Sequence, residues 1–197
     1  MSAGLGPVQK AIFARRSIRT FTDRPVERAV VERLLDAATQ APNHRLTRPW
    51  RFFVLDRPGQ MRDRLAQLAE DVAWRSLPEP RDERARARAR AKAAEILAVP
   101  VLIIAYSVPG RDADETRENY AAVACALQNL QLAAVEEGLA SGWSTGGITR
   151  APEFREVLGA EPGWELVGAL YVGYPTSQTL PARERPGAAT FTRWLCD

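Results

Sequence analysis

The sequence predicts a single α+β domain, and three observations lead to this fold class. Segments with helical spacing of apolar residues are intermingled with short apolar strands, without the regular βαβ alternation of a doubly wound fold. A chain of 197 residues suits one domain with an inserted flap and can bury a full core. From Gly173 onward the chain is rich in Pro, Arg and Gly and has no core of its own. We expect this tail to reach across to a partner subunit.

Composition narrows the class of protein. Apolar residues make up 46% and charged residues 26%, which is ordinary for a soluble protein. The sequence has no apolar run of about 18 residues that could span a membrane, and its N-terminus lacks a signal-peptide pattern. The two cysteines, Cys125 and Cys196, are far apart and form no CxxC pair. We therefore expect a cytoplasmic protein without a disulfide framework or a metal site.

The basic charge comes from one short segment. Residues 81–92, RDERARARARAK, carry six cations and two anions, whereas the whole chain has a net charge of +3. Such a segment allows a nucleic-acid-binding alternative, whose signature would be steep salt dependence. Aromatic residues do not interleave with these arginines, so we do not expect a nucleic-acid partner.

In the first part of the chain, helices precede and follow an irregular basic stretch and a polar loop lies before the first strand. Val26, Val30, Leu34, Leu35 and Ala38 recur at helical spacing between prolines at both ends. Aromatic and branched residues then predict a strand. The expected elements are a helix over 8–15, an irregular stretch over 15–19, a helix over 25–41, a loop over 42–49 and a strand over 50–55.

The second part contains two helices, a buried strand and one long helix. Residues 100–106 are uniformly apolar, which is typical of a strand buried on both faces. From Asn119 to Val135, 13 of 17 residues are apolar or alanine, so we expect this helix to be buried nearly all round, in the core or between subunits. The expected elements are helices over 58–74, 82–98 and 115–137, a short helix from 152, and strands over 100–106 and 165–172.

Two polar clusters lie in the N-terminal part. Arg15, Arg16 and Ser17 offer two guanidinium forks and a hydroxyl, which suit a phosphate; a solvated basic helix end is the alternative. The loop 42–50 contains His44, the only histidine, and opens onto a buried strand, which is a common place for ligand contacts. A structural or simply exposed histidine is the alternative.

Two further clusters lie in the C-terminal part. Residues 138–147, GLASGWSTGG, would let backbone N–H groups approach a flat ligand, with Trp143 as an apolar wall; a plain glycine-rich connection is the alternative. The segment is not GxGxxG, so no Rossmann site is indicated. Residues 181–186 are basic, with a disordered tail as the alternative. No Ser-His-Asp arrangement is visible, so we expect a bound cofactor to carry the chemistry.

Together these clusters resemble the nitroreductase family of FMN enzymes over nearly the whole chain. The resemblance is carried by RRSIRTF, APNHRLTRPWRFFV, ACALQNLQLAAVEEGLASGWSTG and LYVGYP in that order, and it is closest to the small YdjA-type subgroup. It implies one nitroreductase-like domain over 1–197, with a mixed sheet flanked by helices and a variable flap at about 58–98. It also implies an entwined homodimer with exchanged C-terminal tails, whose core is the helix 115–137.

The resemblance also implies the cofactor site. Arg15, Arg16 and Ser17 would hold the ribityl phosphate and the flavin edge, with Arg19 at a position that is often basic. His44 would lie near the flavin of its own chain, whereas Arg48 would come from the partner subunit. The remaining implied contacts are Trp143, Ser144 and Thr145 alongside the isoalloxazine, and Arg183 and Arg185 at the phosphate.

The implied activity is transfer of hydride from NADH or NADPH to small electrophilic acceptors, such as nitroaromatics or quinones, in a ping-pong cycle. No side chain would need to act as acid or base. Another FMN reaction, such as dehalogenation or flavin breakdown, and a non-catalytic FMN-binding protein are the alternatives. The arginines of 81–92 either face the acceptor pocket, favouring anionic acceptors or the 2′-phosphate of NADPH, or form a solvated basic helix.

Overall fold

The computed structural model describes residues 4–177 and 184–195. Its helices and strands lie within two or three residues of most of the expected bounds. The α-helices are α1 (Pro7–Ala14), α2 (Arg28–Thr39), α3 (Gln60–Ser76), α4 (Glu83–Ala98), α5 (Ala113–Glu136) and α6 (Pro152–Leu158). The strands are β1 (Trp50–Leu55), β2 (Val101–Ser107), β3 (Ala140–Ser144) and β4 (Glu165–Gly173). Short 3₁₀ turns are η1 (His44–Leu46), η2 (Gly147–Arg150) and η3 (Ala188–Phe191).

The four strands form one sheet in the order β1-β2-β4-β3, and every neighbouring pair is antiparallel. The α+β class is confirmed, but the expectation of a mixed sheet is wrong for the described strands. All seven residues of β2 are buried, as its uniformly apolar sequence predicts. Helices cover both faces of the central strands, so a continuous apolar run arises here in an antiparallel sheet as it does in parallel ones.

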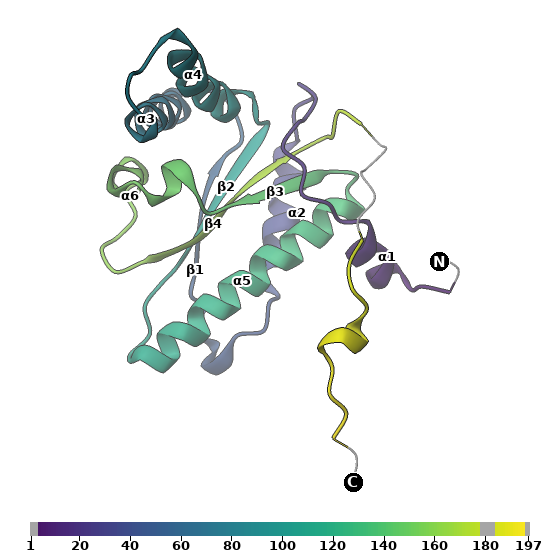
Figure 1. Cartoon of the computed structure of the whole chain (residues 1–197). Helices are drawn as coiled ribbons and strands as arrows, with labels where there is room; N and C mark the ends of the chain where they lie inside the picture. The colour runs from purple at the N-terminus through teal and green to yellow at the C-terminus, as the bar shows by residue number, and fades with distance from the viewer. Residues whose placement is uncertain (1–3, 178–183, 196–197) are drawn as a thin grey trace.

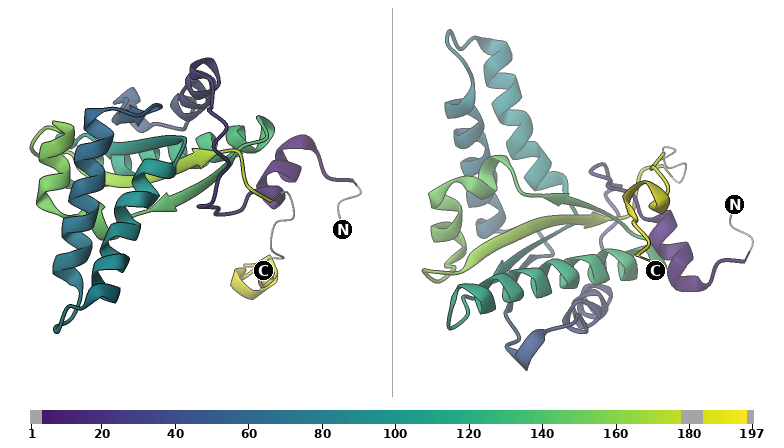
Figure 2. Two further views of the ribbon diagram at one scale, coloured as in Figure 1. Left: turned by 90° about the horizontal axis from the view of Figure 1, so that it is seen from above. Right: turned by 60° about the horizontal axis from the view of Figure 1, so that its bottom comes forward.

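Two helical layers enclose the sheet (Figures 1 and 2). Alternate residues of β2 point to opposite faces: Ile103 packs with α2 and α5, whereas Ile104 packs with α3 and α6. This alternation follows from the two-residue period of a strand. The core therefore has two halves, one on each side of the sheet.

Helices α3 and α4 form an antiparallel hairpin that projects from one end of the sheet (Figure 1). Its base is tied to the sheet by Arg62, which is buried and has no carboxylate partner among the described residues. The guanidinium donates instead to backbone carbonyls, including those of Leu55 at 2.6 Å and Ile96 at 3.2 Å. Further carbonyl acceptors are those of Arg57, Val99 and Pro100.

Helix α5 is covered on one side only within a single chain. Its buried residues face the sheet and α2, whereas Ala121 and Cys125 are exposed and Ala124, Gln128 and Leu132 are partly exposed. The expectation of burial nearly all round is therefore not met within one chain, because the sheet and α2 cover only one face. Because Ala124 packs against the core, we call the outward residues Ala121, Cys125, Gln128 and Leu132 the α5 stripe. No helix in the described ranges is long and apolar enough to cross a bilayer.

The C-terminal segment 184–195 extends away from the body of the molecule (Figures 1 and 2). Phe191, Trp194 and Leu195 are 76%, 83% and 86% exposed. Three large apolar side chains left in solvent are costly, since full burial of such a side chain is worth roughly 1.5–3 kcal/mol. These three side chains are therefore left uncovered within a single chain.

Candidate functional site

The site is built where the segment after α1 meets the edge strand β3. Ser17 and Ser141 form an isolated parallel bridge, and the Ile18 N–H donates to the Ser141 carbonyl at 2.9 Å. Gly142 permits this approach, because a Cβ there would lie only 2.5 Å from the Ile18 oxygen. The alternative interpretation of 138–147 as a plain glycine-rich connection is incomplete, because the segment contains the strand β3, whose Gly142 serves close packing.

Arg15 lies in a cluster of like charges. Its Nη1 donates to the side-chain oxygen of Gln131 at 3.3 Å, and no carboxylate among the described residues forms an ion pair with it. Burial lowers the pKa of Arg15, and the neighbouring charges of Arg185 and Arg16 lower it further. Arg185 of the tail is therefore near enough to influence Arg15, whereas Arg183 lies outside the described residues. Gathered guanidinium groups of this kind are suited to a polyanion.

Arg16 closes the C-terminal end of α1. Its Nη1 donates to the carbonyls of Phe13 and Arg15 at 2.6 and 3.0 Å, which satisfies groups left open by the helix end. A cavity of about 440 Å³, lined in part by Arg15, Arg16 and Ser141, opens beside this cluster. We call it the arginine cavity. The buried Thr22 hydroxyl in its lining has no hydrogen-bond partner in the described part of the chain.

A second cavity, of about 520 Å³, lies between the α3–α4 hairpin and the segment from β3 to η2. We call it the flap cavity. One wall is residues 143–148, and the opposite wall includes Val72, Lys92 and Glu95. At Gly146 and Gly147 a Cβ would meet nothing within 4 Å, so the backbone borders open space there. Both cavities fall within the size range of ligand pockets, roughly 300–1,000 Å³.

The floor of the flap cavity includes Tyr171, which the sequence interpretation missed. Burial raises the pKa of Tyr171, and its hydroxyl is hydrogen-bonded to Ser144. The guanidinium carbon of Arg19 lies 5.7 Å from the centroid of the tyrosine ring, and its Nη2 donates to the Trp143 carbonyl at 3.2 Å. Strand alternation places Ser144 and Tyr171 on one face, a signal that becomes usable only once β3 is recognised as a strand.

Trp143 occupies a different position from the apolar wall expected of it. Its indole lies over Gly168 and packs with the core on the α2–α5 side of the sheet, although the residue also borders the flap cavity. The indole Nε1 is buried and has no partner in the described residues. Ser144 and Thr145, by contrast, line the cavity, as does the backbone that follows them.

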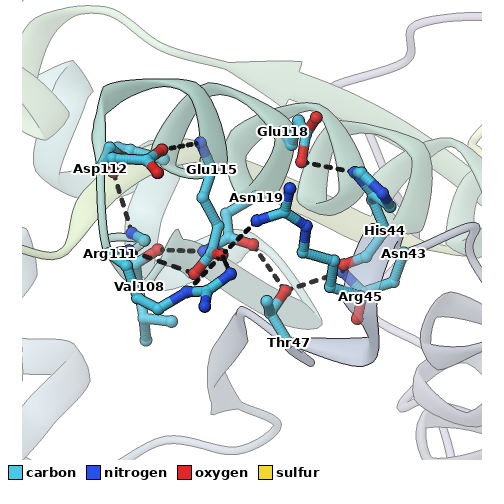
Figure 3. Close-up of polar contacts among 12 residues, drawn as sticks. Asn43, His44, Arg45, Thr47, Val108, Arg111, Asp112, Glu115, Glu118 and Asn119 are labelled. Atoms are coloured by element: carbon cyan, nitrogen blue, oxygen red, sulfur yellow. Dashed lines mark hydrogen bonds and ion pairs between the residues drawn. The ribbon is translucent and has the colours of Figure 1, made fainter.

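The loop containing His44 and Arg48 is held against the N-terminal half of α5 (Figure 3). His44 Nδ1 lies 2.7 Å from Glu118 Oε2, and the Thr47 hydroxyl donates to the buried Asn119 side chain at 2.6 Å. Asn43 bridges the loop, donating to Thr47 Oγ1 at 2.9 Å and accepting from the Arg48 N–H at 2.7 Å.

This loop adopts a strained backbone. Arg45, Leu46 and Arg48 have φ values of 57°, 52° and 48°, which non-glycine residues rarely adopt. Each such residue costs of order 1–3 kcal/mol and persists only where its surroundings enforce it. The polar network of Asn43, Thr47 and Asn119 supplies that enforcement.

The structure does not bring His44 and the Arg15 cluster of the same chain together. His44 contacts Glu118, whereas Arg15 contacts Gln131, and 13 residues of α-helix span about 20 Å. His44 and Arg48 belong to one loop. This geometry therefore gives no support to a flavin site that receives His44 from its own chain and Arg48 from the partner subunit. The predicted residues thus fall into two groups at different positions along α5.

The arginine-rich segment mostly faces away from the flap cavity. Arg84, Arg88 and Arg90 are exposed, and Arg86 lies over the ring of Trp74 at 4.7 Å. Of the six cations in 81–92, only Lys92 lines the cavity, and it pairs with Glu95 at 2.5 Å. No group of three or more metal-ligating side chains occurs within the described residues.

Known proteins resemble this chain over nearly its whole length. The proteins named "Putative NAD(P)H nitroreductase YfhC" from Bacillus subtilis (strain 168) and "Putative NAD(P)H nitroreductase YdjA" from Escherichia coli (strain K12) are 29% and 26% identical to it. The alignments cover 92% and 93% of this chain, and 91% and 97% of those proteins.

Solved structures agree with this likeness. A nitroreductase-like family protein from Bacillus cereus matches with a TM-score of 0.81 and 30% identity, over 99% of this chain and 98% of that one. The FMN and NADPH-dependent nitroreductase NfnB from sphigopyxis sp. strain HMH matches with a TM-score of 0.77 over 98% of this chain and 100% of that one. At 22% identity the second match bears on the fold alone. The model of the Nitroreductase family matches residues 12–174, and the chain belongs to that family.

Proposed function

We propose that the protein is an FMN-dependent oxidoreductase that transfers hydride from NADH or NADPH to small electrophilic acceptors such as nitroaromatics or quinones. The observation that carries this proposal is the cluster of Arg15, Arg16 and Arg185 at the arginine cavity, which Arg15 and Arg16 line. A half-buried arginine that is next to other cations and pairs with no described carboxylate calls for a ligand phosphate. The family and the names of its relatives agree with this assignment.

The residues present fit FMN. Arg15, Arg16, Ser17 and Arg185, with Arg183 expected beside them, would hold the phosphate in the arginine cavity. Ser144, Thr145 and the glycine pair 146–147 would lie alongside the flavin ring, because their backbone borders open space that side chains would otherwise fill. Arg19 lines the flap cavity and would contact the ring edge.

When bound, FMN supplies the redox chemistry, accepting hydride from the nicotinamide and passing electrons to the acceptor in two alternating half-reactions. The protein's own residues bind and orient. The α3–α4 hairpin forms one wall of the flap cavity, where the apolar side chains of Ala69, Val72 and Ile96 offer a surface on which a flat acceptor can pack.

We further propose that the working unit is a homodimer in which each site is completed by the partner subunit. The loop 43–48 lies about 20 Å along α5 from its own Arg15 cluster, so His44 and Arg48 would serve the other subunit's flavin. The α5 stripe and the exposed Phe191, Trp194 and Leu195 supply apolar surface for such an assembly. A small-molecule acceptor is the only other partner that the proposal needs.

The phosphate assignment is tested by the affinity of the apoprotein for FMN. Arg15→Gln removes one charge-assisted contact, worth roughly 1.5–3 kcal/mol, and should weaken binding about tenfold to a hundredfold. The Arg16→Ala/Ser17→Ala double variant should also lose flavin. Arg28→Gln, which breaks an exposed ion pair on α2, is the matched control. Full flavin occupancy in the Arg15 and double variants would refute the assignment.

A further inference from the structure

Two arginines of the flap cavity are held by backbone carbonyls and not by carboxylates. Arg19 donates to the Trp143 carbonyl at 3.2 Å, and Arg150 donates through Nε to the Thr145 carbonyl at 3.1 Å. Neither forms an ion pair with a described residue, and both line the flap cavity. Carbonyl contacts fix the guanidinium groups in place while leaving their positive charge uncompensated.

The other charged groups of the cavity largely cancel. Lys92 and Glu95, on the opposite wall, lie 2.5 Å apart and form an ion pair between successive turns of α4. The lining therefore carries a net positive charge, to which Arg19 and Arg150 contribute. Arg150 also borders a neighbouring surface hollow that includes Glu156 and Glu165, but no ion pair joins it to either.

We propose that the flap cavity recognises an anionic group on the ligand that binds there, with Arg150 as the specificity-determining residue. This inference rests on the proposed function and names its substrate class: an acceptor bearing a carboxylate, or a nucleotide bearing the 2′-phosphate of NADPH. Both sources offer oxyanions to a planar guanidinium fork. Arg84, Arg88 and Arg90 are exposed and do not line the cavity, so they contribute only to the long-range electrostatic potential around it.

Arg19 is not the discriminating residue, because the flavin itself is expected to occupy its edge of the cavity. Arg150 follows the glycine pair and is held at the far end of the 143–145 segment, where a ligand beyond the flavin would reach. Because Glu95 neutralises Lys92, removing the glutamate charge would leave Lys92 available to bind the anionic group of the ligand. Removing Arg150 would instead leave little positive charge to attract that group at this end of the cavity.

The inference is tested on the flavin-loaded full-length protein with para-nitrobenzoate and the neutral para-nitrobenzyl alcohol at fixed NADH. Arg150→Gln should lower kcat/KM for nitrobenzoate about fivefold, the effect of one partly exposed charge pair, and leave nitrobenzyl alcohol unchanged. Glu95→Gln should raise kcat/KM for nitrobenzoate by a similar factor. Arg88→Gln, an exposed arginine on α4 outside the cavity, is the matched control.

A second arm separates the two sources of the anion. With nitrobenzyl alcohol as acceptor, NADPH and NADH are compared in the same variants. A change confined to nitrobenzoate assigns the site to the acceptor, whereas a raised KM for NADPH alone assigns it to the 2′-phosphate. The inference would be overturned if Arg150→Gln and Glu95→Gln changed neither the ratio of kcat/KM for nitrobenzoate to that for nitrobenzyl alcohol nor the ratio of the KM values for NADPH and NADH.

A binding measurement keeps this outcome distinct from failure of the proposed function. Titration of unreactive benzoate by calorimetry requires no turnover, and Arg150→Gln should weaken benzoate binding about fivefold relative to Arg88→Gln. If benzoate binding depends on Arg150 but NADPH never reduces the protein, the anion site stands and the oxidoreductase proposal fails. If the flavin is reduced, but neither benzoate binding nor the KM for NADPH depends on Arg150, the oxidoreductase proposal stands and the anion site fails.

Discussion

Arg15 and Arg62 show how differently two arginines without carboxylate partners can be used. Arg62 is almost fully buried, yet backbone carbonyls accept from its guanidinium on every side. Arg15 is less buried, has one amide acceptor, and lies near two other cations that lower its pKa. The first arginine is satisfied by the fold, whereas the second is left for a ligand.

Arg62 should therefore matter for stability. Arg62→Met keeps the apolar stem but leaves several buried carbonyls without donors, and each such group costs about 1–3 kcal/mol. We expect a loss of roughly 2–4 kcal/mol in the free energy of unfolding, measured by urea denaturation. Arg64→Met, on the exposed side of the same helix, is the control and should change the stability by less than about 0.5 kcal/mol.

Thr47 should hold the strained loop in place. Thr47→Val keeps the side-chain shape but removes the hydrogen bonds with Asn43 and Asn119, and Asn119 is buried. We expect faster amide hydrogen exchange over residues 43–48. In the proposed dimer FMN retention should also weaken, because His44 and Arg48 would lose their positions. Thr39→Val, at the exposed end of α2, is the control. Unaltered exchange in the loop would show that the network does not enforce its conformation.

At the scale of elements, α5 is fixed at both ends by ion pairs. Near the first turn, Arg111 donates to Glu115 through Nη2 at 2.6 Å and through Nε at 2.8 Å. Just beyond the last turn, Arg33 on α2 donates to Glu137 at 2.7 Å. The hydrogen bonds from Arg111 and Arg33 lower the pKa values of Glu115 and Glu137 below their ordinary value of 4.5. Both ends of the helix therefore depend on ionised carboxylates.

The sign of the pH dependence follows from these shifts. A carboxylate whose pKa is depressed in the folded state stabilises that state above pH 4.5, and the stabilisation is lost as the pH falls through the lowered value. We expect the free energy of unfolding of Glu115→Gln to fall less steeply than that of the wild type below pH 4.5. Glu136→Gln, exposed on the same helix, is the control. Parallel pH profiles for Glu115→Gln and the wild type would contradict the account.

Most elements could be predicted from local pattern, and the exceptions have physical causes. β1 begins and ends where its aromatic and branched residues do, and α5 ends next to Gly138 as the C-cap rule implies. β3 was missed because Gly142 lowers strand propensity, while its close contact with Ile18 comes from far away in sequence. The antiparallel order was missed because a uniformly apolar strand indicates that helices cover both faces of the sheet, but it does not indicate the direction of the neighbouring strands.

At the scale of the whole molecule, the site residues predicted from sequence fall into two groups along α5. Local motifs identified the segments that bear Arg15, His44 and Ser144, but no local pattern reports which segments share one chain's site. Tyr171 and Arg150 were missed for the same reason, since strand pairing and cavity shape bring them together. The proposed second subunit would account for the separation, for the α5 stripe and for the exposed tail at once.

The stripe should control assembly. Ala121→Arg places a charge on the outward face of α5, where a small side chain allows close packing. If the proposed dimer forms through this face, the variant should be a monomer that has lost the proposed FMN. Analytical ultracentrifugation with the flavin absorbance recorded in the same run measures both properties. Ala87→Arg, exposed on α4, is the control. A dimer that keeps its flavin despite Ala121→Arg would locate the interface elsewhere.

The visible absorption spectrum of the purified protein, before and after anaerobic addition of NADPH, tests the central claim most directly. The account predicts an oxidised-flavin band, retained after gel filtration, that bleaches when NADPH is added and returns when a nitroaromatic acceptor follows. A protein that remains colourless after incubation with FMN and gel filtration would contradict the account, because the arginine cluster would then hold no flavin phosphate.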